Sequence, residues 1–365
     1  MNTKRIIIFY PTFAGGGITR NLENILNFFE RKNIFTFLFS HNTKNLRANK
    51  NLNIIANNYK LFKKGNSLIN IFSSTIDLIR FLIKNKKINL ILSMQNHLPA
   101  IIVAKIFKKK IIIRNSEEIF SATKHADNKV TAYLVLFLKF LFYRLSDSII
   151  AISIKSKSSL KKLGIKENKI RLIYNPFIKK ILKKKNKTYR YGNEFNIISI
   201  GRLTKQKNFI NLINVISDLQ KEYPFINLII IGNGPDFKIL KALTKINSKI
   251  SIFNWTKNID KYYNKSHLFV LNSLYEGLPN ILIEAVNKSI PCLSTDCSGA
   301  EDILLKSKGG FIVPIDDKFF LKKKIEFILK NYKTALKKSQ IAKKKLNRFT
   351  QKNCESYYSI ILDNS

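Results

Sequence analysis

Hydrophobic residues along the chain gather in short continuous runs, and these alternate with longer segments of helical periodicity. In the first half, the runs predict strands at Ile6–Tyr10, Ile34–Ser40, Ile88–Met94, Ile111–Arg114 and Ser148–Ile152. The periodic segments predict helices at Ile18–Lys32, Ser67–Lys84, Leu98–Lys108, Val130–Leu145 and Lys155–Leu163. Continuous apolar runs are typical of parallel strands, because crossover helices bury both faces of such a sheet.

A charged stretch, NPFIKKILKKKNKTYRYGNEF (Asn175–Phe195), interrupts this alternation and is interpreted as an interdomain linker. The alternation then restarts, with strands predicted at Asn196–Gly201, Asn227–Gly232, Ile250–Phe253, Leu268–Asn272 and Ile290–Ser294. Helices are predicted between them, at about 207–221, 236–246, 259–265 and 280–288, and a Lys-rich helical tail begins at Asp317. The pattern predicts an α/β protein with two Rossmann-like doubly wound domains facing a central cleft. Ligands of such folds bind at the carboxyl ends of the strands.

Length and composition agree with a folded protein of two domains. The chain has 365 residues, of which 45% are hydrophobic. Its three cysteines, Cys292, Cys297 and Cys354, have neither metal-ligand spacing nor an even number for disulfides, which indicates a reducing compartment. The apolar run Ile6–Tyr10 is too short for a signal peptide, and Val130–Leu145 is too short and too charged to span a bilayer.

The net charge has two interpretations. Lys and Arg number 65 against 23 Asp and Glu, a formal net charge of +42. Such an excess indicates a polyanionic partner, either nucleic acid or an acidic membrane. Alternatively, the abundance of Lys, Asn and Ile together indicates an AT-rich coding bias, which explains the Lys content better than the shortage of acids.

Two Gly-containing loops follow predicted strands. Gly15, Gly16 and Gly17 lie between the first strand and the first helix, where they let a backbone approach a ligand; a tight turn without a ligand is the alternative. Gly232 and Gly234 lie in a G-N-G-P turn after Asn227–Gly232, and in a doubly wound fold this turn lines the strand-end crevice.

The stretch IISIGRLTKQKNF (Ile197–Phe209) places Arg202 and Lys207 around the start of a helix. Two cations beside a helix N-terminus can bind a diphosphate without a metal ion. The alternative is two solvated basic residues in a Lys-rich chain.

The stretch YEGLPNILIEA (275–285) carries two glutamates, Glu276 and Glu284, around a helix start at Pro279. Backbone N–H groups near Leu278–Ile281 would be available to a phosphate or sugar oxygen, and a carboxylate can accept two hydrogen bonds from vicinal hydroxyls. One stretch could thus bind a sugar, a diphosphate and a second sugar, which is the outline of a nucleotide-sugar. The alternative is one surface glutamate and one satisfied, half-buried glutamate.

Together these motifs resemble the retaining glycosyltransferases of family 4, which have the two-domain GT-B fold. EGLPNILIEAVNKSIPCLSTDCSGAEDIL (276–304) is similar to the donor-site signature of that family. SDSIIAIS (146–153) and KIRLIYNPF (169–177) are similar to the strand and turn that close its first domain. The resemblance covers nearly the whole chain and is most specific in residues 195–304.

The resemblance implies a role for each matching residue. Arg202 and Lys207 would neutralise the donor diphosphate, and Glu284 would bind the ribose. Glu276 would contact the transferred sugar. The donor-binding set is completed by residues Gly16, Gly17, Gly232, Gly234, Gly277, Leu278, Pro279, Asn280 and Ile281.

The resemblance also implies a domain plan. The acceptor-side domain would span 1–177, a linker 178–194 and the donor-binding domain 195–345. A C-terminal helix at 346–365 would pack back on the first domain. No cofactor is expected, because the nucleotide-sugar is a substrate. No metal is expected either, because no D-x-D carboxylate pair is present.

One departure concerns the first domain. Many family members have a His in the stretch that matches IIIRNSEE (111–118), where this chain has Arg114, Asn115 and Ser116. Asn115 and Ser116 are retained as acceptor-side candidates. His97 and His125 lie nearby in sequence but do not match the motif. A base on the protein is dispensable if the leaving phosphate takes the acceptor proton.

The leading hypothesis is a retaining, metal-independent glycosyltransferase. It would move a hexose or N-acetylhexosamine from a UDP-linked donor to a lipid-linked glycan in bacterial surface polysaccharide or lipopolysaccharide synthesis. We expect a cytoplasmic protein, peripheral on the inner face of an anionic membrane and bound there by its first domain. The alternatives are a nucleotide-sugar epimerase of the same fold and, from another class, a basic nucleic-acid-binding protein. No recognition helix, aromatic RNA-binding motif or zinc finger supports the last, so no nucleic-acid partner is expected.

Overall fold

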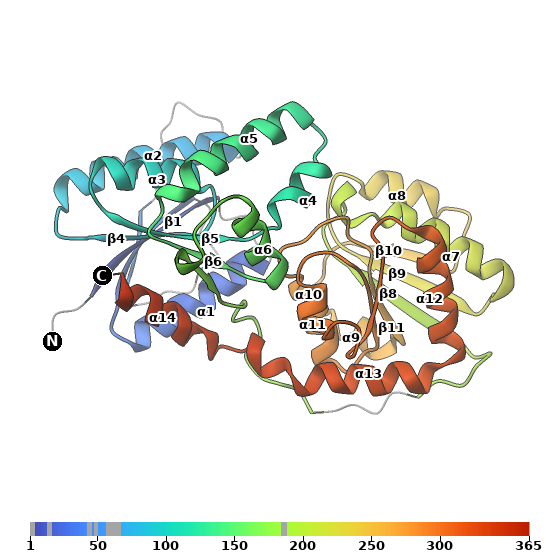
Figure 1. Cartoon of the computed structure of the whole chain (residues 1–365). Coiled ribbons are helices and arrows are strands. Elements are labelled where there is room, and N and C mark those ends of the chain that lie inside the picture. The colour runs from blue at the N-terminus through green and yellow to red at the C-terminus, as the bar shows by residue number, and fades with distance from the viewer. Residues whose placement is uncertain are drawn as a thin grey trace. The chain divides into compact units, whose positions relative to one another are not determined.

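The computed structural model describes residues 4–12, 17–41, 46, 50–55, 67–183 and 188–364. The chain divides into two compact units (Figure 1). The first contains Met1–Lys179 together with Phe349–Ser365, and the second contains Lys180–Arg348. Residues 184–187 of the predicted linker lie outside the described part of the chain.

The first unit is built on a parallel sheet of strand order β3-β2-β1-β4-β5-β6-β7. Its strands are β1 (Arg5–Thr12), β2 (Phe35–His41), β3 (Leu52–Ile55), β4 (Leu90–Ser93), β5 (Lys110–Asn115), β6 (Ser148–Ala151) and β7 (Ile170–Leu172). The central strands are buried along their length, as the continuous apolar runs predict.

Helices cover both faces of this sheet. On one face, α2 (Ser67–Lys84), α3 (His97–Ile106) and α5 (Lys129–Phe142) lie side by side over a core that includes Leu78, Leu82 and Ile101 (Figure 1). On the other face, α1 (Gly17–Arg31) packs against the C-terminal helix α14 (Asn353–Asp363). The remaining helices are α4 (Ile119–Lys124) and α6 (Ile154–Lys162), with 3-10 turns at Tyr143–Leu145 and Glu167–Lys169.

The second unit has a parallel sheet of order β10-β9-β8-β11-β12-β13. Its strands are β8 (Phe195–Ile200), β9 (Ile226–Ile231), β10 (Ile250–Phe253), β11 (Leu268–Leu271), β12 (Cys292–Thr295) and β13 (Phe311–Val313). Its helices are α7 (Phe209–Glu222), α8 (Phe237–Leu243), α9 (Asp260–Lys265), α10 (Asn280–Asn287), α11 (Ala300–Leu304), α12 (Lys318–Lys330) and α13 (Tyr332–Lys344). The 3-10 turn η3 (Lys205–Lys207) lies before α7, and a second turn, η4 (Leu346–Phe349), connects this unit to α14.

The fold-class prediction of two doubly wound α/β sheets is confirmed, and the differences lie in short elements. The pattern did not predict β3, β13, α4 or α11, which are three to six residues long. Segments of this length hold too few residues to display a period. The predicted helix Val130–Leu145 is α5 followed by a 3-10 turn, and the predicted helix over 346–365 is η4 followed by α14.

Candidate functional site

Backbone hydrogen bonds join the loops that follow β8 and β9 at the carboxyl edge of the second sheet. The N–H of Gly201 donates to the Ile231 carbonyl (3.1 Å), and the N–H of Leu203 donates to the Asn233 carbonyl (2.9 Å). A Cβ on Gly232 would lie 1.8 Å from the Gly201 carbonyl oxygen, and one on Gly234 would lie 2.2 Å from that of Leu203. Glycine is therefore required at both positions by backbone contact with the loop that carries Arg202.

Lys207 and Glu276 form an ion pair at this edge. Lys207 ends the turn η3, and Glu276 lies in the loop between β11 and α10. Both side chains are nearly buried, with 14% and 11% of their surfaces exposed. The Ser273 hydroxyl also donates to the Glu276 carboxylate (2.8 Å), so this carboxylate is held from two sides. Arg202 is exposed earlier in the connection from β8 to α7 that also carries Lys207.

The loop from β11 to α10 is fixed along its length. The side-chain amide of Gln206 donates a hydrogen bond to the Tyr275 carbonyl (2.8 Å). The backbone carbonyl of Gln206 accepts one from the Leu274 N–H (2.8 Å). From the β12 side, the Thr295 hydroxyl donates to the Ser273 carbonyl (2.6 Å). These bonds make a rigid support for Glu276, which is what a precise binding site requires.

The Gly277-Leu278-Pro279 turn rests on the loop after β12. The Ser298 hydroxyl donates to the Gly277 carbonyl (3.1 Å). Gly299 has a φ of +79°, and a Cβ there would lie 2.8 Å from the Leu278 Cα. The support residues Ser273, Thr295, Ser298 and Gly299 were not among the predicted site residues, although most lie inside the STDCSGAE stretch that carries the resemblance.

Helix α10 begins at Asn280, so Pro279 is its N-cap rather than its first helical residue. The first helical hydrogen bonds run from the N–H groups of Leu282 and Ile283 to the Pro279 carbonyl. The positive end of the helix dipole thus lies beside Glu276 and favours an anion. Leu282, Ile283, Ala285 and Val286 anchor the helix in the core, while Glu284 lies half-buried on another face.

Cys297 lies close to the Lys207–Glu276 pair, but its thiol is unreactive. Burial, together with the nearby charge of Glu276, raises the pKa of its thiol to about 12. The thiolate is the nucleophilic form of cysteine, so Cys297 is a packing residue here.

In the first unit, the candidates at the end of β5 and directly after it make internal contacts. Asn115 is buried, and its amide donates to the Glu117 carbonyl (2.7 Å) and the Ser156 hydroxyl (3.0 Å). Ser116 accepts a hydrogen bond from Arg114, which also donates to Asn175 and to the Tyr357 hydroxyl of α14 (2.9 Å). Gly17 begins α1, and Gly16 lies outside the described residues.

His97, at the start of α3, is a structural residue. It is buried, with Nδ1 2.8 Å from the Ser93 hydroxyl and its ring edge-on to Tyr143. Burial, with the positive charges of Lys139 and Arg114, lowers the pKa of His97 to about 3, although a hydrogen bond to the Arg114 backbone opposes this. The imidazole is therefore neutral at physiological pH.

Comparison with known proteins identifies the family. A sequence model described as Glycosyltransferase Family 4 matches residues 15–177, and one described as Glycosyl transferases group 1 matches residues 180–345. The chain belongs to the family 4 glycosyltransferases. This confirms the resemblance drawn from the motifs at 202–207, 232–235 and 276–304.

Solved structures of the same fold cover almost the entire chain. The Anabaena protein HepE, solved with UDP and glucose, has a TM-score of 0.75 at 15% identity and covers 99% of this chain and 100% of its own. Sucrose-phosphate synthase from Thermosynechococcus elongatus has a TM-score of 0.80 at 14% identity, with coverage of 99% and 100%. Identities this low establish the fold alone, which is the GT-B fold.

Curated relatives match over shorter stretches. An uncharacterised glycosyltransferase of Methanocaldococcus jannaschii is 34% identical over 227 residues, which are 57% of this chain and 54% of that protein. A Campylobacter jejuni enzyme, N-acetylgalactosamine-N,N'-diacetylbacillosaminyl-diphospho-undecaprenol 4-alpha-N-acetylgalactosaminyltransferase, is 28% identical over 225 residues, 59% of this chain and 60% of its own. The chain spans about half the length of the first two curated relatives it matches.

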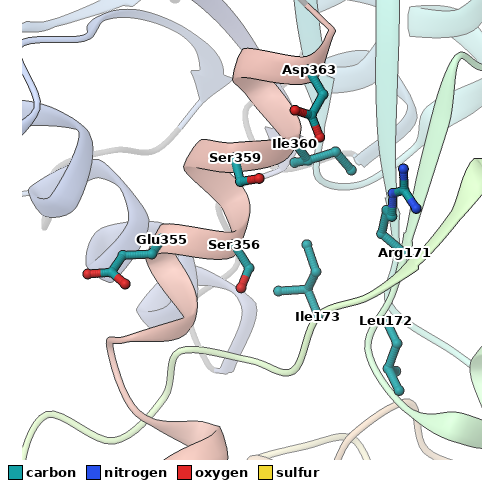
Figure 2. A pocket seen from close by; sticks show the side chains of 8 residues that line it. All are labelled: Arg171, Leu172, Ile173, Glu355, Ser356, Ser359, Ile360 and Asp363. Carbon is teal, nitrogen blue, oxygen red and sulfur yellow. The ribbon is translucent and has the colours of Figure 1, made fainter.

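A pocket of about 400 Å³ lies within the first unit (Figure 2). Arg171, Leu172 and Ile173 line it from β7 and the residue after it. Glu355, Ser356, Ser359, Ile360 and Asp363 line it from α14. None of the predicted site residues borders this pocket.

Proposed function

We propose that the chain is a retaining glycosyltransferase that moves a hexose or N-acetylhexosamine from UDP to a lipid-linked glycan, in bacterial surface polysaccharide or lipopolysaccharide synthesis. The observation that carries the proposal is the Lys207–Glu276 ion pair beside the N-terminus of α10, with Glu284 on the same helix. A cation, a helix dipole and two carboxylates are gathered there within one unit. In a nucleotide-sugar the anionic diphosphate lies between two sugars. A cation and a helix N-terminus suit the diphosphate, and one carboxylate suits the hydroxyls of each sugar.

Each residue has a role in the proposed donor site. Arg202 and Lys207 bind the diphosphate, and Glu284 accepts hydrogen bonds from the ribose hydroxyls. Glu276 contacts the transferred sugar. The turn Gly277–Pro279 and the N–H groups at Asn280 and Ile281 bind sugar and phosphate oxygens, and Gly232 and Gly234 let the adjoining loops approach each other there. The donor-binding role of Gly16 and Gly17, which belong to the first unit, stays a prediction. The acceptor-side role of Asn115 and Ser116 stays a prediction.

The proposed transfer balances without a base on the protein. The acceptor oxygen bonds to the anomeric carbon on the face from which the diphosphate leaves, and the departing oxygen keeps the electron pair of the broken bond. The acceptor proton passes to that phosphate oxygen. Lys207 and Arg202 stabilise the negative charge that grows on the diphosphate, which is the electrostatic contribution that lowers such barriers most. The reaction as written requires no metal ion.

Relatives support the donor and acceptor classes. HepE was solved in complex with UDP-glucose. The name of the Campylobacter jejuni relative specifies a diphospho-undecaprenol-linked acceptor, and that of an Escherichia coli relative specifies UDP-Gal and another such acceptor. We therefore propose a UDP-sugar donor and an acceptor carried on a membrane lipid.

An apolar surface on the first unit supports attachment to a membrane. Helix α5 has no buried residue, and its Val130, Tyr133, Leu134 and Phe137 are 80%, 61%, 57% and 56% exposed. Helix α3 packs against both α5 and α2, and these helices also carry exposed apolar side chains, with Ile106 on α3 and Phe72 on α2 68% and 60% exposed. Leu136 and Phe142 of α5 pack against the core of the first unit, while most of its other apolar side chains are exposed. Monomeric soluble proteins seldom expose contiguous apolar surface of this kind.

Cations border the apolar surface. Lys84 ends α2, Lys86 and Lys87 follow it, and Lys108 and Lys110 follow α3; all five are exposed. A further Lys-rich stretch, residues 60–64, lies outside the described residues. Each cation near an anionic bilayer contributes on the order of 1 kcal/mol, so a few of them suffice for reversible binding. In the parts of the chain that the structure describes, no helix is long and apolar enough to cross a membrane. We propose a peripheral position on the inner face of the cytoplasmic membrane.

A panel of nucleotide-sugars tests the proposed function. The full chain is mixed with UDP-, GDP- and ADP-linked hexoses and N-acetylhexosamines, and thermal shift and donor hydrolysis without acceptor are measured. Stabilisation by a UDP-sugar and slow hydrolysis of that donor are expected. When a simple alcohol is then added as acceptor, the glycoside formed should keep the anomeric configuration of the donor sugar. Absence of binding by every nucleotide-sugar would refute the proposal, and C4 or C2 inversion of the bound donor would favour the epimerase.

A further inference from the structure

The only tryptophan of the chain, Trp255, lies exposed at the carboxyl edge of the second sheet. It follows β10 by two residues, and 53% of its surface is exposed. Tryptophan is highly buried on average, and an indole left open to solvent forgoes a large apolar contribution to folding. An exposed tryptophan at a ligand-binding edge is therefore a candidate contact residue.

The backbone of Trp255 is held in place by the loop after β9. The Trp255 N–H donates to the side-chain oxygen of Asn233 (3.0 Å), and the Gly232 N–H donates to the Phe253 carbonyl (2.9 Å). Asn233 in turn accepts the Leu203 N–H at its backbone carbonyl (2.9 Å). Leu203 directly follows Arg202, the proposed diphosphate cation. A chain of hydrogen bonds across three neighbouring strand ends therefore connects the loop of Arg202 to the backbone of Trp255.

The spacing of these strand ends matches a nucleoside. Strands β8, β9 and β10 are consecutive in the sheet, and neighbouring strands lie roughly 4.8 Å apart, so β8 and β10 are separated by roughly 10 Å. A ribose with its base spans a comparable distance from the phosphate that it carries. A diphosphate at Arg202 and Lys207 would thus leave the base within reach of Trp255.

We propose that the indole of Trp255 is the stacking surface for the nucleobase of the donor. This inference rests on the proposed donor site and adds a residue that the motifs did not indicate. Since every base has a π face, stacking contributes affinity with little selectivity among bases. Trp255 therefore strengthens binding of any nucleoside diphosphate, and selection of uracil falls to contacts with the edges of the base.

The single tryptophan makes the test direct. Trp255 emission is followed during titration of the wild-type chain with UDP, GDP, ADP, inorganic pyrophosphate and a hexose oligosaccharide. Calorimetry then gives the affinities of Trp255→Ala, Trp255→Phe and the matched control Tyr191→Ala for UDP and pyrophosphate. Tyr191 is also 53% exposed and lies in the same unit, but it precedes β8 instead of following a strand.

We expect saturable quenching by the nucleoside diphosphates and unchanged emission with pyrophosphate. Trp255→Ala should weaken UDP binding roughly tenfold, as expected for loss of one stacked base, and leave pyrophosphate binding unchanged. Trp255→Phe should recover part of the loss, and Tyr191→Ala should bind as the wild type. In turnover, Trp255→Ala should raise KM and spare kcat, because the base contact is the same in the ground and transition states.

Two outcomes separate this inference from the proposed function. UDP binding without a change in emission, with wild-type affinity in Trp255→Ala, would overturn the stacking role and leave the donor site intact. Emission that responds to the oligosaccharide and not to UDP would also overturn it, assigning the indole to a glycan. If no nucleotide binds at all by calorimetry, the proposed function fails and this inference with it.

Discussion

The ammonium group of Lys207 is ion-paired with the carboxylate of Glu276, 69 positions along the chain. Both groups are nearly buried, so each attracts the other more strongly than an exposed pair would. A diphosphate that approaches Lys207 competes with Glu276 for the same ammonium. The pair therefore couples binding of the diphosphate to release of the carboxylate that we assign to the transferred sugar.

Replacement of the cation should reduce turnover more than binding. Negative charge grows on the diphosphate as the glycosidic bond breaks, so Lys207 contributes more in the transition state than in the ground state. We expect Lys207→Met to lower kcat by about 100-fold and to change KM less, as measured by steady-state kinetics. Lys221→Met is the matched control, since Lys221 lies exposed on α7 with only a surface partner, Asp218. Unchanged kcat in a folded Lys207→Met would refute the assignment.

Neutralising the other member of the pair should have the opposite effect on anion binding. In Glu276→Gln the ammonium of Lys207 no longer faces a competing carboxylate, so the affinity for inorganic pyrophosphate should rise several-fold, since close ion pairs of this kind contribute more than surface pairs. Turnover should fall, because the contact with the transferred sugar loses its charge. Calorimetry gives the affinity and kinetics the turnover. Weaker pyrophosphate binding would show that Glu276 holds Lys207 in position instead of competing for it.

Glu284 should act on the nucleoside alone. Its carboxylate is assigned to the ribose hydroxyls, and hydrogen bonds to charged groups contribute about 1.5–3 kcal/mol each. Glu284→Ala should weaken UDP binding at least tenfold, raise KM and leave kcat and pyrophosphate affinity nearly unchanged. Glu284→Gln keeps one acceptor and should lose less. Equal losses for UDP and pyrophosphate would place Glu284 at the phosphates.

His97 predicts how the first unit responds to acid. Its pKa is about 3 in the folded protein against 6.5 for the free side chain, so the folded state holds this proton less tightly than the unfolded state. The associated stability is fully present above pH 6.5 and is lost as the pH falls toward 3, by about 1.4 kcal/mol per pH unit. His97→Gln should flatten this dependence of the free energy of unfolding.

Thiol labelling in urea can measure the two units separately. Cys354 is buried in the first unit, whereas Cys292 and Cys297 are buried in the second. Labelling of Cys354 should show the acid-dependent loss in the wild type and a weaker one in His97→Gln. Labelling of Cys292 and Cys297 should be the same in both proteins. An identical pH dependence at Cys354 in the two proteins would contradict the role given to His97.

Local sequence patterns predicted the two-sheet architecture and the candidate donor-site residues at the carboxyl edge of the second sheet. Continuous apolar runs identified the buried parallel strands, and Gly232, Gly234 and the Glu276–Glu284 stretch stood where parallel strands end. Their backbone constraints are local, so a short stretch of sequence expresses them. The class of fold follows from the same alternation, whereas the order of the strands comes from the structure.

Hydrogen bonds and ion pairs between residues far apart in the sequence could not be predicted from local patterns. Arg114 was noted only as a departure from a family motif, yet it is buried and bonded to Asn175 and Tyr357, 61 and 243 positions away. Lys207 and Glu276 were both assigned to the donor site, but their mutual ion pair depends on how β8 and β11 adjoin. The sequence of α5 did not decide its exposure either, because a strongly apolar helix can serve as a core helix or as an exposed apolar surface.

The exposed apolar surface of the first unit makes the final prediction, which concerns vesicle binding. Wild-type protein should co-sediment with vesicles that contain anionic lipid, and binding should fade in high salt, because screening weakens the attraction of Lys84, Lys86 and Lys87 for the headgroups. Burial of an aromatic or leucine side chain contributes about 1.5–3 kcal/mol. Leu134→Ser with Phe137→Ser should therefore reduce binding at least tenfold, while activity on a soluble acceptor is retained. Phe319→Ser is the matched control, since Phe319 is 63% exposed on α12 of the second unit. Equal recovery in the supernatant with neutral and anionic vesicles at low salt would refute membrane binding by this surface. RNA binding under the same conditions would favour a nucleic-acid partner as the reason for the excess positive charge.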